Sequence, residues 1–520
     1  MPVSECTRTC DSLRRALQVV ESESHPSYVT GGFVRDSLLG RPSRDIDIVV
    51  EGDPFAIAQS VARTVGGSFV PLNEHHCVAR VILRSYEQTA SSDRKLGHDD
   101  LTIDFTRYEG SIEDDLTRRD FTIDAIAVPT DVVGVNLSEQ GTCAAAIITE
   151  NAIDPLGGLQ DLANRTVKAG GRDTFAHDPG RLLRAVRLAR ELSFSIETTT
   201  ESLIRSNADL ISRVAPERTR EEFIRLLNLP LAADSVRYLD YLGLLMRIIP
   251  ELETSRDVEQ PTCHFWDVLE HSIQTVATFE FIAGQSDWRY GNDEVIECLP
   301  GEPAFQTYIS GAVSSTASRS VLIKIGCLLH DIGKPHTKEL DDSGRARFLG
   351  HSREGASLSR SILQRLRFSN HEIEYIETLV YNHLRPAQMS TEGPPTARAV
   401  YRFFRDTGDA GLGVLYLAMA DYLACRGPLF MMSEWRNVCS LISYILQEHR
   451  RQEIAIAPTR LIDGRELMQE LGIQPGPVVG RLLEAIREAQ AAGLVGTREE
   501  ALELSRRTIG SEHFTVRDSK

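Results

Sequence analysis

Residues 44–50 read RDIDIVV, and this stretch decides the architecture of the N-terminal part of the chain. Side chains alternate across a β-strand, so Asp45 and Asp47 project from one face while the intervening isoleucines fill the other. Two like charges held side by side repel each other and cost stability. The pair therefore predicts a strand that is buried on its apolar face and binds a positive charge on its acidic face.

A glycine turn precedes this strand in YVTGGFVRDSLLGR, residues 28–41. A short strand runs into Gly31 and Gly32, and a helix then carries Arg35. Glycines at a strand-to-helix turn let backbone N–H groups approach a phosphate, and the helix N-terminus adds positive potential. With the two aspartates close behind it, the turn predicts an enzyme that holds Mg²⁺ against a nucleoside triphosphate. The alternative is a pair of aspartates salt-bridged on an exposed edge strand.

Charge and composition narrow the class of protein. The chain has 520 residues, a length that predicts about three or four domains. Its net charge of −17 argues against a protein coated in nucleic acid. No run approaches the ~18 apolar residues of a membrane span, and the N-terminus MPVSECTRTCDSLRR lacks the apolar segment of a secretion signal. Nine cysteines without a C-x-x-C pair suit a reducing cytosol. We therefore expect a cytoplasmic protein without a membrane partner.

The pattern of apolar residues divides the chain into segments. Between 27 and 165, strand-like runs (SYVTGG, DIDIVV, RVILRS, LTIDFTR and AAIIT) alternate with short helical stretches, which is typical of an α/β fold. From about residue 172 onward the apolar period is helical, apart from 284–318, which reads as a long loop-like insertion. We expect an α/β head over 1–165, a helical neck over 166–250, a helical metal-binding domain over 251–450 and a helical tail over 451–520.

A second set of candidate ligands lies in the helical part. LLHDIGK places His330 and Asp331 at the end of an apolar helix, and Asp421 interrupts another apolar helix in YLAMADYLACRG. Burying an unpaired carboxylate is expensive unless it is hydrogen-bonded or ligates a metal. Histidine and aspartate that converge from separate helices form a divalent-metal site. The predicted ligands, in chain order, are His271, His330, Asp331, His351, His383 and Asp421.

Five segments of the head and neck together resemble one enzyme family. GGFVRDSLLGRPSRDIDIVVEG is similar to the first motif of the bacterial-type (class II) tRNA nucleotidyltransferase and poly(A) polymerase family. The resemblance continues in DLTRRDFTIDAIA (115–127), IDPLGGLQDL (153–162), DPGRLLRAVRLAREL (178–192) and APERTREEFIRLL (215–227). It implies a polymerase-beta-like α/β nucleotidyltransferase head, a mostly α-helical neck and body, and an all-α HD domain. It also implies nucleotidyl transfer, in which an RNA 3′-hydroxyl attacks an α-phosphate and pyrophosphate leaves, with Asp45 and Asp47 bridging two Mg²⁺ ions.

The resemblance assigns roles to further residues of the head. In the family the second arginine and the aspartate of the R-R-D motif contact the nucleotide, and by position these are Arg119 and Asp120. Asp104, in the strand-like LTIDFTR, is the candidate for a third carboxylate of the catalytic metal site. His177 stands where the family has glutamate, and Asp124 stands where it has asparagine. These departures bear on nucleotide selectivity more than on the chemistry.

A basic stripe follows in the neck. Its side chains recur every three residues, so we expect them to climb one side of a helix. On its own such a stripe is typical of a solvated face. In the family this helix presents aspartate and arginine side chains to the Watson–Crick edge of the incoming base, so that the protein replaces a nucleic-acid template. The residues concerned are Asp178, Arg181, Arg184 and Arg187.

The ligand order H…HD…H…H…D resembles the HD phosphohydrolase superfamily, and HD domains occur fused to some members of this nucleotidyltransferase family. The resemblance implies a second, hydrolytic activity that uses Mn²⁺, Ni²⁺, Co²⁺, iron or Mg²⁺. The alternative is a remnant domain that only shapes the RNA-binding body.

The short connection before the R-R-D motif bears on which nucleotides the enzyme adds. Members that add the full CCA end carry a flexible loop of a dozen or more residues before the R-R-D motif, whereas here only YEGSIED separates Arg107 from Asp115. Subgroups without the loop resemble CC-adding enzymes. We therefore expect tRNA and CTP as partners, CC as the added sequence, and a separate A-adding enzyme that acts afterwards.

Other readings remain open. A loop supplied by residues 84–100 would allow full CCA addition, with ATP as a further substrate, and an A-adding enzyme is another alternative. A poly(A) polymerase would accept many RNAs and use only ATP. Outside the transferases, the chain would be an HD phosphohydrolase with a nucleotide-sensing head, or a regulatory RNA-binding protein, which the acidic net charge disfavours.

Overall fold

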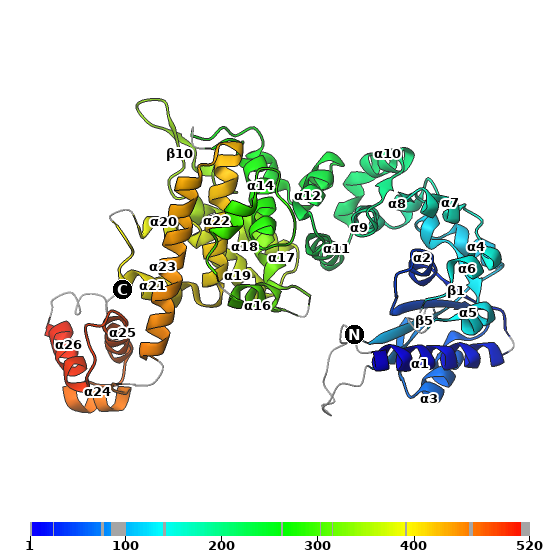
Figure 1. The fold of residues 1–520 in the computed structure, drawn as a ribbon, viewed down its shortest axis with the longest axis horizontal. Helices are drawn as coiled ribbons and strands as arrows, with labels where there is room; N and C mark the ends of the chain where they lie inside the picture. Colours follow the sequence, from blue (N-terminus) through cyan, green and yellow to red (C-terminus); the bar gives the residue numbers. More distant parts are fainter. Residues whose placement is uncertain are drawn as a thin grey trace. The chain divides into compact units, whose positions relative to one another are not determined.

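The computed structural model describes residues 3–23, 25–73, 77–84, 100–138, 142–261, 264–301, 303–314, 316–390, 393–456 and 461–510. The chain forms two compact units, coloured from blue to red along the sequence in Figure 1. The first comprises Met1–Val214 with Leu242–Leu244, and the second comprises Ala215–Tyr241 with Leu245–Lys520. The division falls inside the segment 166–250 that was expected to form a neck.

The first unit is built on a six-stranded mixed sheet with the order β3-β4-β5-β2-β1-β6. β2 pairs in parallel with β5, and the other neighbours are antiparallel. The RDIDIVV stretch forms β2, which therefore lies between two partners in the middle of the sheet. The strands are β1 (Ser27–Thr30), β2 (Asp45–Val50), β3 (Ser68–Asn73), β4 (Val78–Leu83), β5 (Leu101–Arg107) and β6 (Ala127–Pro129).

The two faces of β2 differ as the alternation predicts. Ile46 and Ile48 are buried in the main core of the head. Helices α1 (Val3–Ser22) and α3 (Pro54–Val65), which pack on each other, contribute to that core (Figure 1). On the opposite face Val49 belongs to a smaller apolar cluster, while Asp45 and Asp47 stay partly accessible.

Two local predictions for the head were wrong. AAIIT is not a strand, because residues Ala145–Asn151 form helix α6, in which Ile148 is buried against the main core. Tertiary packing of this one side chain outweighs the strand propensity of the run. The edge strand β3 was missed, because Pro71 and its mostly exposed neighbours give no apolar alternation.

The remainder of the first unit is made of short helices that lead from the sheet into a helical extension. α2 (Gly32–Leu38) follows β1, and α4 (Ile112–Thr117) follows β5. The other elements are α5 (Thr130–Asn136), α7 (Gly158–Ala163), α8 (Thr174–His177), α9 (Arg181–Leu192), α10 (Thr198–Asn207), the 3₁₀ turns η1 (Thr122–Asp124) and η2 (Ala208–Arg213), and the short parallel pair β7 (Thr166–Val167) and β8 (Ser195–Ile196).

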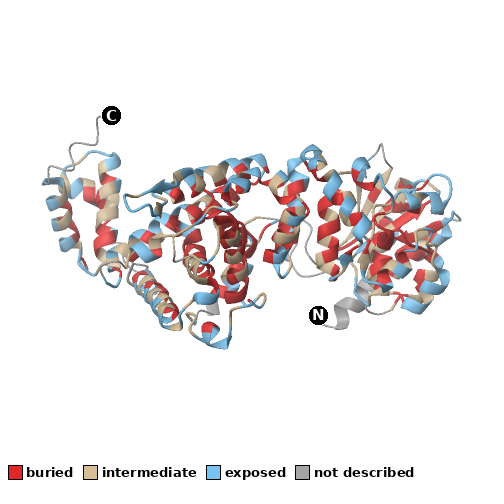
Figure 2. Cartoon of the chain, turned by 90° about the horizontal axis from the view of Figure 1, so that it is seen from above, coloured by how far each residue is buried: buried red, intermediate tan, exposed pale blue. Residues whose placement is uncertain are grey.

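The second unit is almost entirely helical, as predicted, and the only strands among its described residues are β9 (Glu339–Leu340) and β10 (Ala346–Arg347). Figure 2 shows buried helices at its centre; these are α14, α17, α19 and α22, which pack on one another. The helices are α11 (Pro216–Asn228), α12 (Ala232–Tyr241), α13 (Leu245–Ile248), α14 (Val268–Ile282), α15 (Asp293–Glu297), α16 (Pro303–Ser310), α17 (Arg319–Leu329), α18 (His351–Arg365), α19 (Asn370–Asn382), α20 (Arg385–Gln388), α21 (Ala397–Thr407), α22 (Gly411–Arg426), α23 (Met432–Ile456), α24 (Gly464–Leu471), α25 (Pro477–Ala491) and α26 (Arg498–Gly510).

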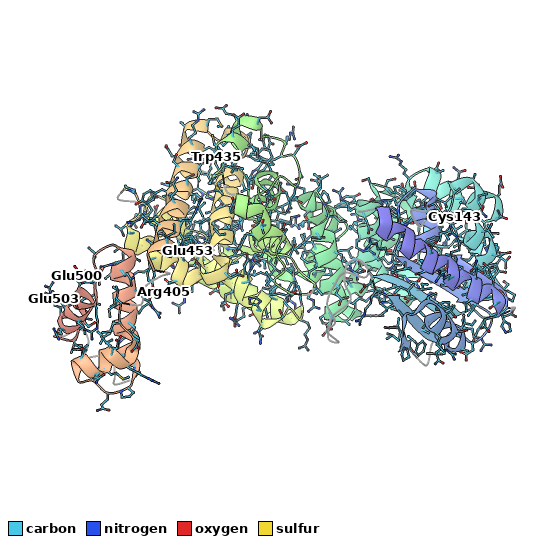
Figure 3. All side chains as sticks on the ribbon, turned by 60° about the horizontal axis from the view of Figure 1, so that its bottom comes forward. Cys143, Arg405, Trp435, Glu453, Glu500 and Glu503 are labelled. Atoms are coloured by element: carbon cyan, nitrogen blue, oxygen red, sulfur yellow. The ribbon has the colours of Figure 1, made fainter. Side chains whose placement is uncertain are left out.

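The segment 284–318 is more ordered than a loop-like insertion. It contains α15 and α16, and Trp288 and Phe305 within it are buried. Trp435 of α23, labelled in Figure 3, is fully buried and donates its indole N–H to the carbonyl of Val295 in α15 (2.9 Å). Aromatic anchors of this kind hold the segment to the helical core.

The last three helices form a small bundle with its own apolar core, which includes Leu467 and Leu482. Ion pairs connect this bundle to α21: Arg405, labelled in Figure 3, contacts Glu484 at 3.3 Å, and Arg398 and Arg402 contact Glu488 at 2.9 and 2.7 Å. Within the part of the chain that the structure describes, no helix has the length and apolar character needed to cross a membrane.

A buried ion pair joins α14 and α17. Lys324 is 2% exposed and Glu280 is 1% exposed, and the Lys324 Nζ to Glu280 Oε1 distance is 2.9 Å. The ammonium also donates to the carbonyl of Leu227 (2.9 Å), and the carboxylate accepts from the N–H of Ala232 at the start of α12 (3.0 Å). Burial lowers the pKa of Lys324, and Glu280 opposes this shift.

We predict that Lys324→Met destabilises the protein by about 3–5 kcal/mol, because it leaves the Glu280 carboxylate buried without a counter-charge. The double variant Lys324→Met/Glu280→Gln removes both charges and keeps an acceptor for the Ala232 N–H, so it should recover most of the loss. Urea unfolding followed by circular dichroism measures both effects. Equal losses in the single and double variants would contradict this account.

Candidate functional site

Three carboxylates line the two central strands of the head on one face. Asp47 of β2 lies directly beside Asp104 of β5 in the parallel register, and Asp45 accepts a hydrogen bond from the hydroxyl of Thr102 (2.7 Å). The pKa of Asp47 is raised to about 6: burial is the largest cause, Arg119 opposes it, and the charges of Asp45 and Asp104 add to the rise. A cation on this face would relieve the strain of holding the three charges together.

The glycine turn leaves room for this arrangement. Gly31 has φ +70°, and a Cβ atom on it would lie 2.7 Å from Asp47 Oδ2 and 3.3 Å from Arg119 Nη1. A side chain here would therefore collide with the acidic face, in addition to the strain that a positive φ imposes on any other residue. The turn brings the start of α2, at Gly32, close to the carboxylates.

Arg80 of β4 is a member of this site that sequence reasoning missed. It lies opposite Asp104 in the antiparallel register, and its Nε and Nη2 each approach one oxygen of that carboxylate at 2.6 Å. Bidentate pairing of this kind fixes the carboxylate and neutralises it. The signal was present in the alternation VARVIL, which puts Arg80 on the polar face between buried Ala79 and Val81.

A buried network of ion pairs connects the glycine turn, the R-R-D motif and α9. Arg35 Nη1 lies 2.7 Å from Asp124 Oδ1, and Arg184 Nη2 lies 3.5 Å from the second oxygen of the same carboxylate. Arg184 Nε also contacts Asp120 Oδ2 at 2.8 Å. Arg35 is only 7% exposed and also pairs with Asp36 at 3.0 Å. Arg35 was predicted, with Gly31 and Gly32, to belong to the nucleotide-binding site; its guanidinium holds two carboxylates of the protein.

The departure at Asp124 has a structural explanation in this network. A carboxylate has two charged acceptor oxygens, so each can pair with a different guanidinium, whereas an asparagine side chain offers one uncharged acceptor oxygen. Arg35 comes from α2 and Arg184 from α9, so Asp124 connects three separate segments of the chain.

The basic stripe of the neck is arranged differently from the prediction. α9 begins at Arg181, and Asp178 lies before it with extended backbone angles (φ −143°, ψ 98°). The cause is Pro179, because the residue before a proline is sterically excluded from the helical region. The carboxylate of Asp178 accepts the N–H of Gly180 (3.0 Å) and lies 3.8 Å from Arg181 Nε. Asp178 therefore belongs to the turn that introduces the helix.

Two other predicted nucleotide-binding arginines have local partners. Arg187 pairs with Glu191 one turn later in α9. Arg119 lies 3.4 Å from Asp115 within the R-R-D segment. Arg181 and Arg184 stand at the N-terminal end of α9, so they are the stripe residues next to Asp120.

In the second unit the structure brings all six predicted metal ligands together from different helices. His271 Nε2 lies 3.1 Å from Asp421 Oδ1, 3.3 Å from Asp331 Oδ2 and 3.1 Å from His330 Nε2. On the other side of Asp331, the Oδ1 atom lies 3.4 Å from His351 Nε2 and 3.8 Å from His383 Nε2. Asp331 thus connects two clusters of ligand atoms.

A second hydrogen bond orients three of the four imidazoles for metal binding. The Nδ1 atoms of His330, His351 and His383 lie 2.7–2.8 Å from the carbonyl oxygens of residues three positions earlier in the chain. A carbonyl only accepts, so each Nδ1 carries a proton and each Nε2 faces the centre as the ligand atom. Burial by itself lowers the pKa of His330, but Asp331 and Asp421 outweigh this effect and raise the pKa to about 10, so a metal would have to displace a proton from the Nε2 of that ring. Burial lowers the pKa of His383 to about 4 and also lowers that of His351, which keeps these rings neutral. This donor set fits a divalent metal.

Two residues beside this centre were not predicted. Lys334 Nζ lies 2.5 Å from Asp331 Oδ2 and 3.4 Å from His264 Nε2. The ring of His264 meets that of His271 edge-on at 5.3 Å. Lys334 could have been read from LLHDIGK, since it follows the ligand pair by one helical turn, whereas nothing in the sequence distinguishes His264.

We call the six-residue cluster around Asp331 the HD centre. The acidic face of the head and the HD centre differ in how closely their ligand atoms approach one another. Among the described residues, groups of three His, Cys, Asp or Glu ligand atoms within 4.8 Å of one another occur only around Asp331. In the head, the bidentate pair with Arg80 holds Asp104, and the glycine turn stands beside Asp47.

Three family models match successive parts of the chain. Residues 27–168 match the family described as Poly A polymerase head domain. Residues 193–255 match the probable RNA and SrmB-binding site of polymerase A, and residues 268–425 match the HD domain.

Relatives match along nearly the whole chain. The A-adding tRNA nucleotidyltransferase of Deinococcus radiodurans is 33% identical, covering 91% of this chain and 93% of its own. The CC-adding tRNA nucleotidyltransferase of Thermus thermophilus is 31% identical, covering 91% of this chain and 92% of its own. A structure of the Thermotoga maritima CCA-adding enzyme complexed with tRNA shares the fold, with a TM-score of 0.57 at 20% identity over 96% of this chain and 95% of that one.

We predict that Asp331→Asn weakens Mn²⁺ binding at the centre by at least about 10–100-fold, the range typical when a group that supports metal ligation is lost. The amide keeps the size of the side chain but removes the charge shared by the two ligand clusters. His371→Ala removes an exposed histidine at the start of α19 and serves as the control. Equilibrium dialysis with metal analysis measures both variants, and undiminished binding in Asp331→Asn would refute the assignment of these residues.

Proposed function

The chain belongs to the bacterial class II tRNA nucleotidyltransferases that carry an HD domain, and from this premise we propose that it adds two cytidines to the 3′ end of tRNA from CTP. tRNA and CTP are then its substrates. A separate A-adding enzyme completes the CCA end.

The observation that carries the CC proposal is the short connection between β5 and α4. β5 ends at Arg107 and α4 begins at Ile112. Tyr108 is 7% exposed, and its ring meets that of Tyr28 edge-on at 6.0 Å. At the other end, Ser111 caps α4, and its side chain accepts the N–H of the third helical residue (3.1 Å). The connection is therefore held at both ends.

A connection of this kind cannot serve as a mobile lever. Family members that add the full CCA use a flexible loop at this place while the nucleotide site changes from accepting CTP to accepting ATP. Without that movement the site keeps one selectivity, and addition stops after the cytidines. Residues 85–99, which contain most of the alternative loop at 84–100, lie outside the described residues.

Residues of the acidic face and α9 supply the parts that the reaction needs. We assign Asp45 and Asp47 to the Mg²⁺ site, where the metal lowers the pKa of the attacking hydroxyl and neutralises the leaving pyrophosphate. Arg119 lies beside Asp47 at the glycine turn and suits the triphosphate. Arg181 and Asp178 stand at the start of α9, where they would meet the base.

Of the remaining residues, most act on the site indirectly, and Asp104 belongs to it. Asp120 and Arg184 form an ion pair, which sets the position of α9 relative to the sheet. Asp124 connects this pair to Arg35 at the glycine turn, because it contacts both arginines. Arg187 lies one turn further along α9. Asp104 is fixed by Arg80 beside Asp47, which makes it the third carboxylate of the site.

Two neighbouring products have specific support. The Deinococcus relative is named an A-adding enzyme, so A-addition to a tRNA that already ends in CC is the nearest alternative. Full CCA addition is the other, because several relatives that match shorter parts of the chain are named CCA-adding enzymes.

We predict that the enzyme extends a tRNA ending at its discriminator base by CC and then stalls, even with CTP and ATP both present. Sequencing the product ends measures this directly. The same assay with a tRNA that ends in CC tests A-addition. A terminal adenosine on most molecules of either substrate would refute the CC proposal.

A matched pair of variants ties the reaction to the acidic face. Asp47→Ala should lower CMP incorporation by at least about 10³-fold, since metal ligation supplies several kcal/mol of transition-state stabilisation. Glu51→Ala removes an exposed carboxylate that directly follows β2 and should leave incorporation unchanged. Cooperative unfolding of both variants excludes a general loss of structure.

We further propose that the HD centre hydrolyses phosphate esters. The convergence of six ligands, with the tautomer fixed at three of the four imidazoles, favours this over a remnant domain, because a domain that only shaped the RNA-binding body would gain nothing from burying them. A bound metal would polarise a phosphoryl oxygen and activate water. Lys334 and His264 lie where they can contact the same phosphate.

The two sites have separate ligands, so their activities should separate. With Mn²⁺, Ni²⁺ or Co²⁺ the wild type should open a 2′,3′-cyclic phosphate, and Asp331→Asn should abolish this cleavage while nucleotide addition continues at the wild-type rate. Thin-layer chromatography of a labelled cyclic nucleotide follows the cleavage. If the wild type cleaves no phosphate ester with any of these metals, the centre is a remnant.

A further inference from the structure

An exposed aromatic surface lies beside the HD centre. We call Phe265, Trp266 and Tyr290 the aromatic rim. The rings of Phe265 and Trp266 meet edge-on at 4.6 Å, and that of Tyr290 lies 6.4 Å from Trp266. Phe265 is 47% exposed, and the guanidinium of Arg289 lies over the Tyr290 ring at 5.7 Å. The rim thus joins an accessible aromatic ring with a nearby positive charge.

The rim lies next to the opening of the metal centre. His271, His330 and Asp331 have at most 2% of their side chains exposed, whereas Asp421 has 22%, so the centre opens at Asp421. The backbone N–H of Phe265 donates to the carbonyl of Cys425 (2.9 Å), which lies one turn after Asp421 on the same side of α22. The backbone of Phe265 therefore lies about one helical turn along α22 from the accessible carboxylate.

The rim is also tied to the cation of the centre. Gln260 accepts a hydrogen bond from Lys334 Nζ at 2.6 Å through its Oε1, and its Nε2 donates to the carbonyl of Trp266 at 3.3 Å. His264, which contacts Lys334, directly precedes Phe265 in the chain. The segment from Gln260 to Trp266 thus contacts the cation Lys334 through Gln260 and His264, and it carries the exposed ring of Phe265.

We propose that Phe265 is the base-stacking residue of the HD centre, on whose ring lies the nucleobase of a nucleotide whose phosphate enters the centre. A nucleotide fits because its charged phosphate and its flat base match Lys334 and the exposed ring. Unstacked bases bind aromatic side chains in this way without regard to sequence, since every base has a π-face. The proposal rests on the proposed hydrolase function and specifies its substrate class as nucleoside phosphates and RNA ends.

Exposed aromatic residues also serve as protein-docking anchors, but the position of Phe265 favours a nucleotide. Its backbone is bonded to the helix that carries a metal ligand, and its neighbour contacts the cation of the centre. A docking anchor needs no connection to the metal site, whereas a residue that orients a substrate does.

The test compares a ligand that has a base with one that has none. Cytidine 3′-phosphate and inorganic phosphate are titrated into metal-free enzyme by isothermal calorimetry, with saturating CTP to occupy the head. Phe265→Ala should raise the Kd for cytidine 3′-phosphate about 10-fold, in line with the loss of one stacked base, and leave that for phosphate unchanged. Phe265→Trp should restore the affinity. Leu429→Ala, which removes an exposed apolar residue outside the rim, should change neither.

A second readout uses the loaded enzyme. With Mn²⁺, Phe265→Ala should raise KM for cytidine 2′,3′-cyclic phosphate and leave kcat and Mn²⁺ affinity as in the wild type. Equal losses for cytidine 3′-phosphate and phosphate, or no loss for either, would overturn the proposal, as would a wild type that binds cytidine 3′-phosphate no better than phosphate. If the wild type binds the nucleotide but cleaves no ester, the hydrolase proposal fails while the effect of Phe265→Ala on binding still tests stacking.

Discussion

Repulsion among Asp45, Asp47 and Asp104 is the constraint around which the head is organised. The three carboxylates stand on the two central strands, where the sheet holds them at fixed spacing. Arg80 neutralises one of them from the neighbouring strand, and Arg119 approaches another through the space left by Gly31. The charge that remains on this face is available to a metal, so the same arrangement that costs stability creates the site.

The HD centre handles buried charge by a different route. Its carboxylates lie among imidazoles whose tautomers are fixed by backbone carbonyls at the ends of α17 and α19 and at the start of α18. Two of these carbonyls lie in the last turns of α17 and α19, where carbonyl groups lack partners within the helix, and the third, that of Phe348, lies just before α18. Helix ends therefore supply the orientation that strand register supplies in the head. The two sites have no ligand in common, which is why each can be altered by itself.

The sequence indicated the central strand and the metal ligands because both rest on local patterns. The alternation of acidic and apolar residues along β2 can be read from the strand alone, and Asp421 is a single charged residue inside an apolar helix. Arg80 and His264 were missed because their roles depend on register and on contacts between segments distant in sequence. Asp178 was placed in a helix although Pro179 excludes it, so here the local signal existed and the three-residue spacing was given too much weight. The pairing of Arg35 with Asp124 was likewise not visible in the sequence, because Asp124 comes from another segment.

The attachment of the C-terminal bundle has a different physical character from the rest of the second unit. Arg398, Arg402 and Arg405 connect α21 to α25 through ion pairs with half-exposed arginines, whereas the bundle itself is held by apolar packing. Mobile electrolyte screens exposed charges over a Debye length of about 8 Å at physiological ionic strength, but it has little effect on an apolar core. Rising salt therefore loosens the attachment before it unfolds the bundle, and this end of the chain responds to its ionic surroundings as an electrostatic joint.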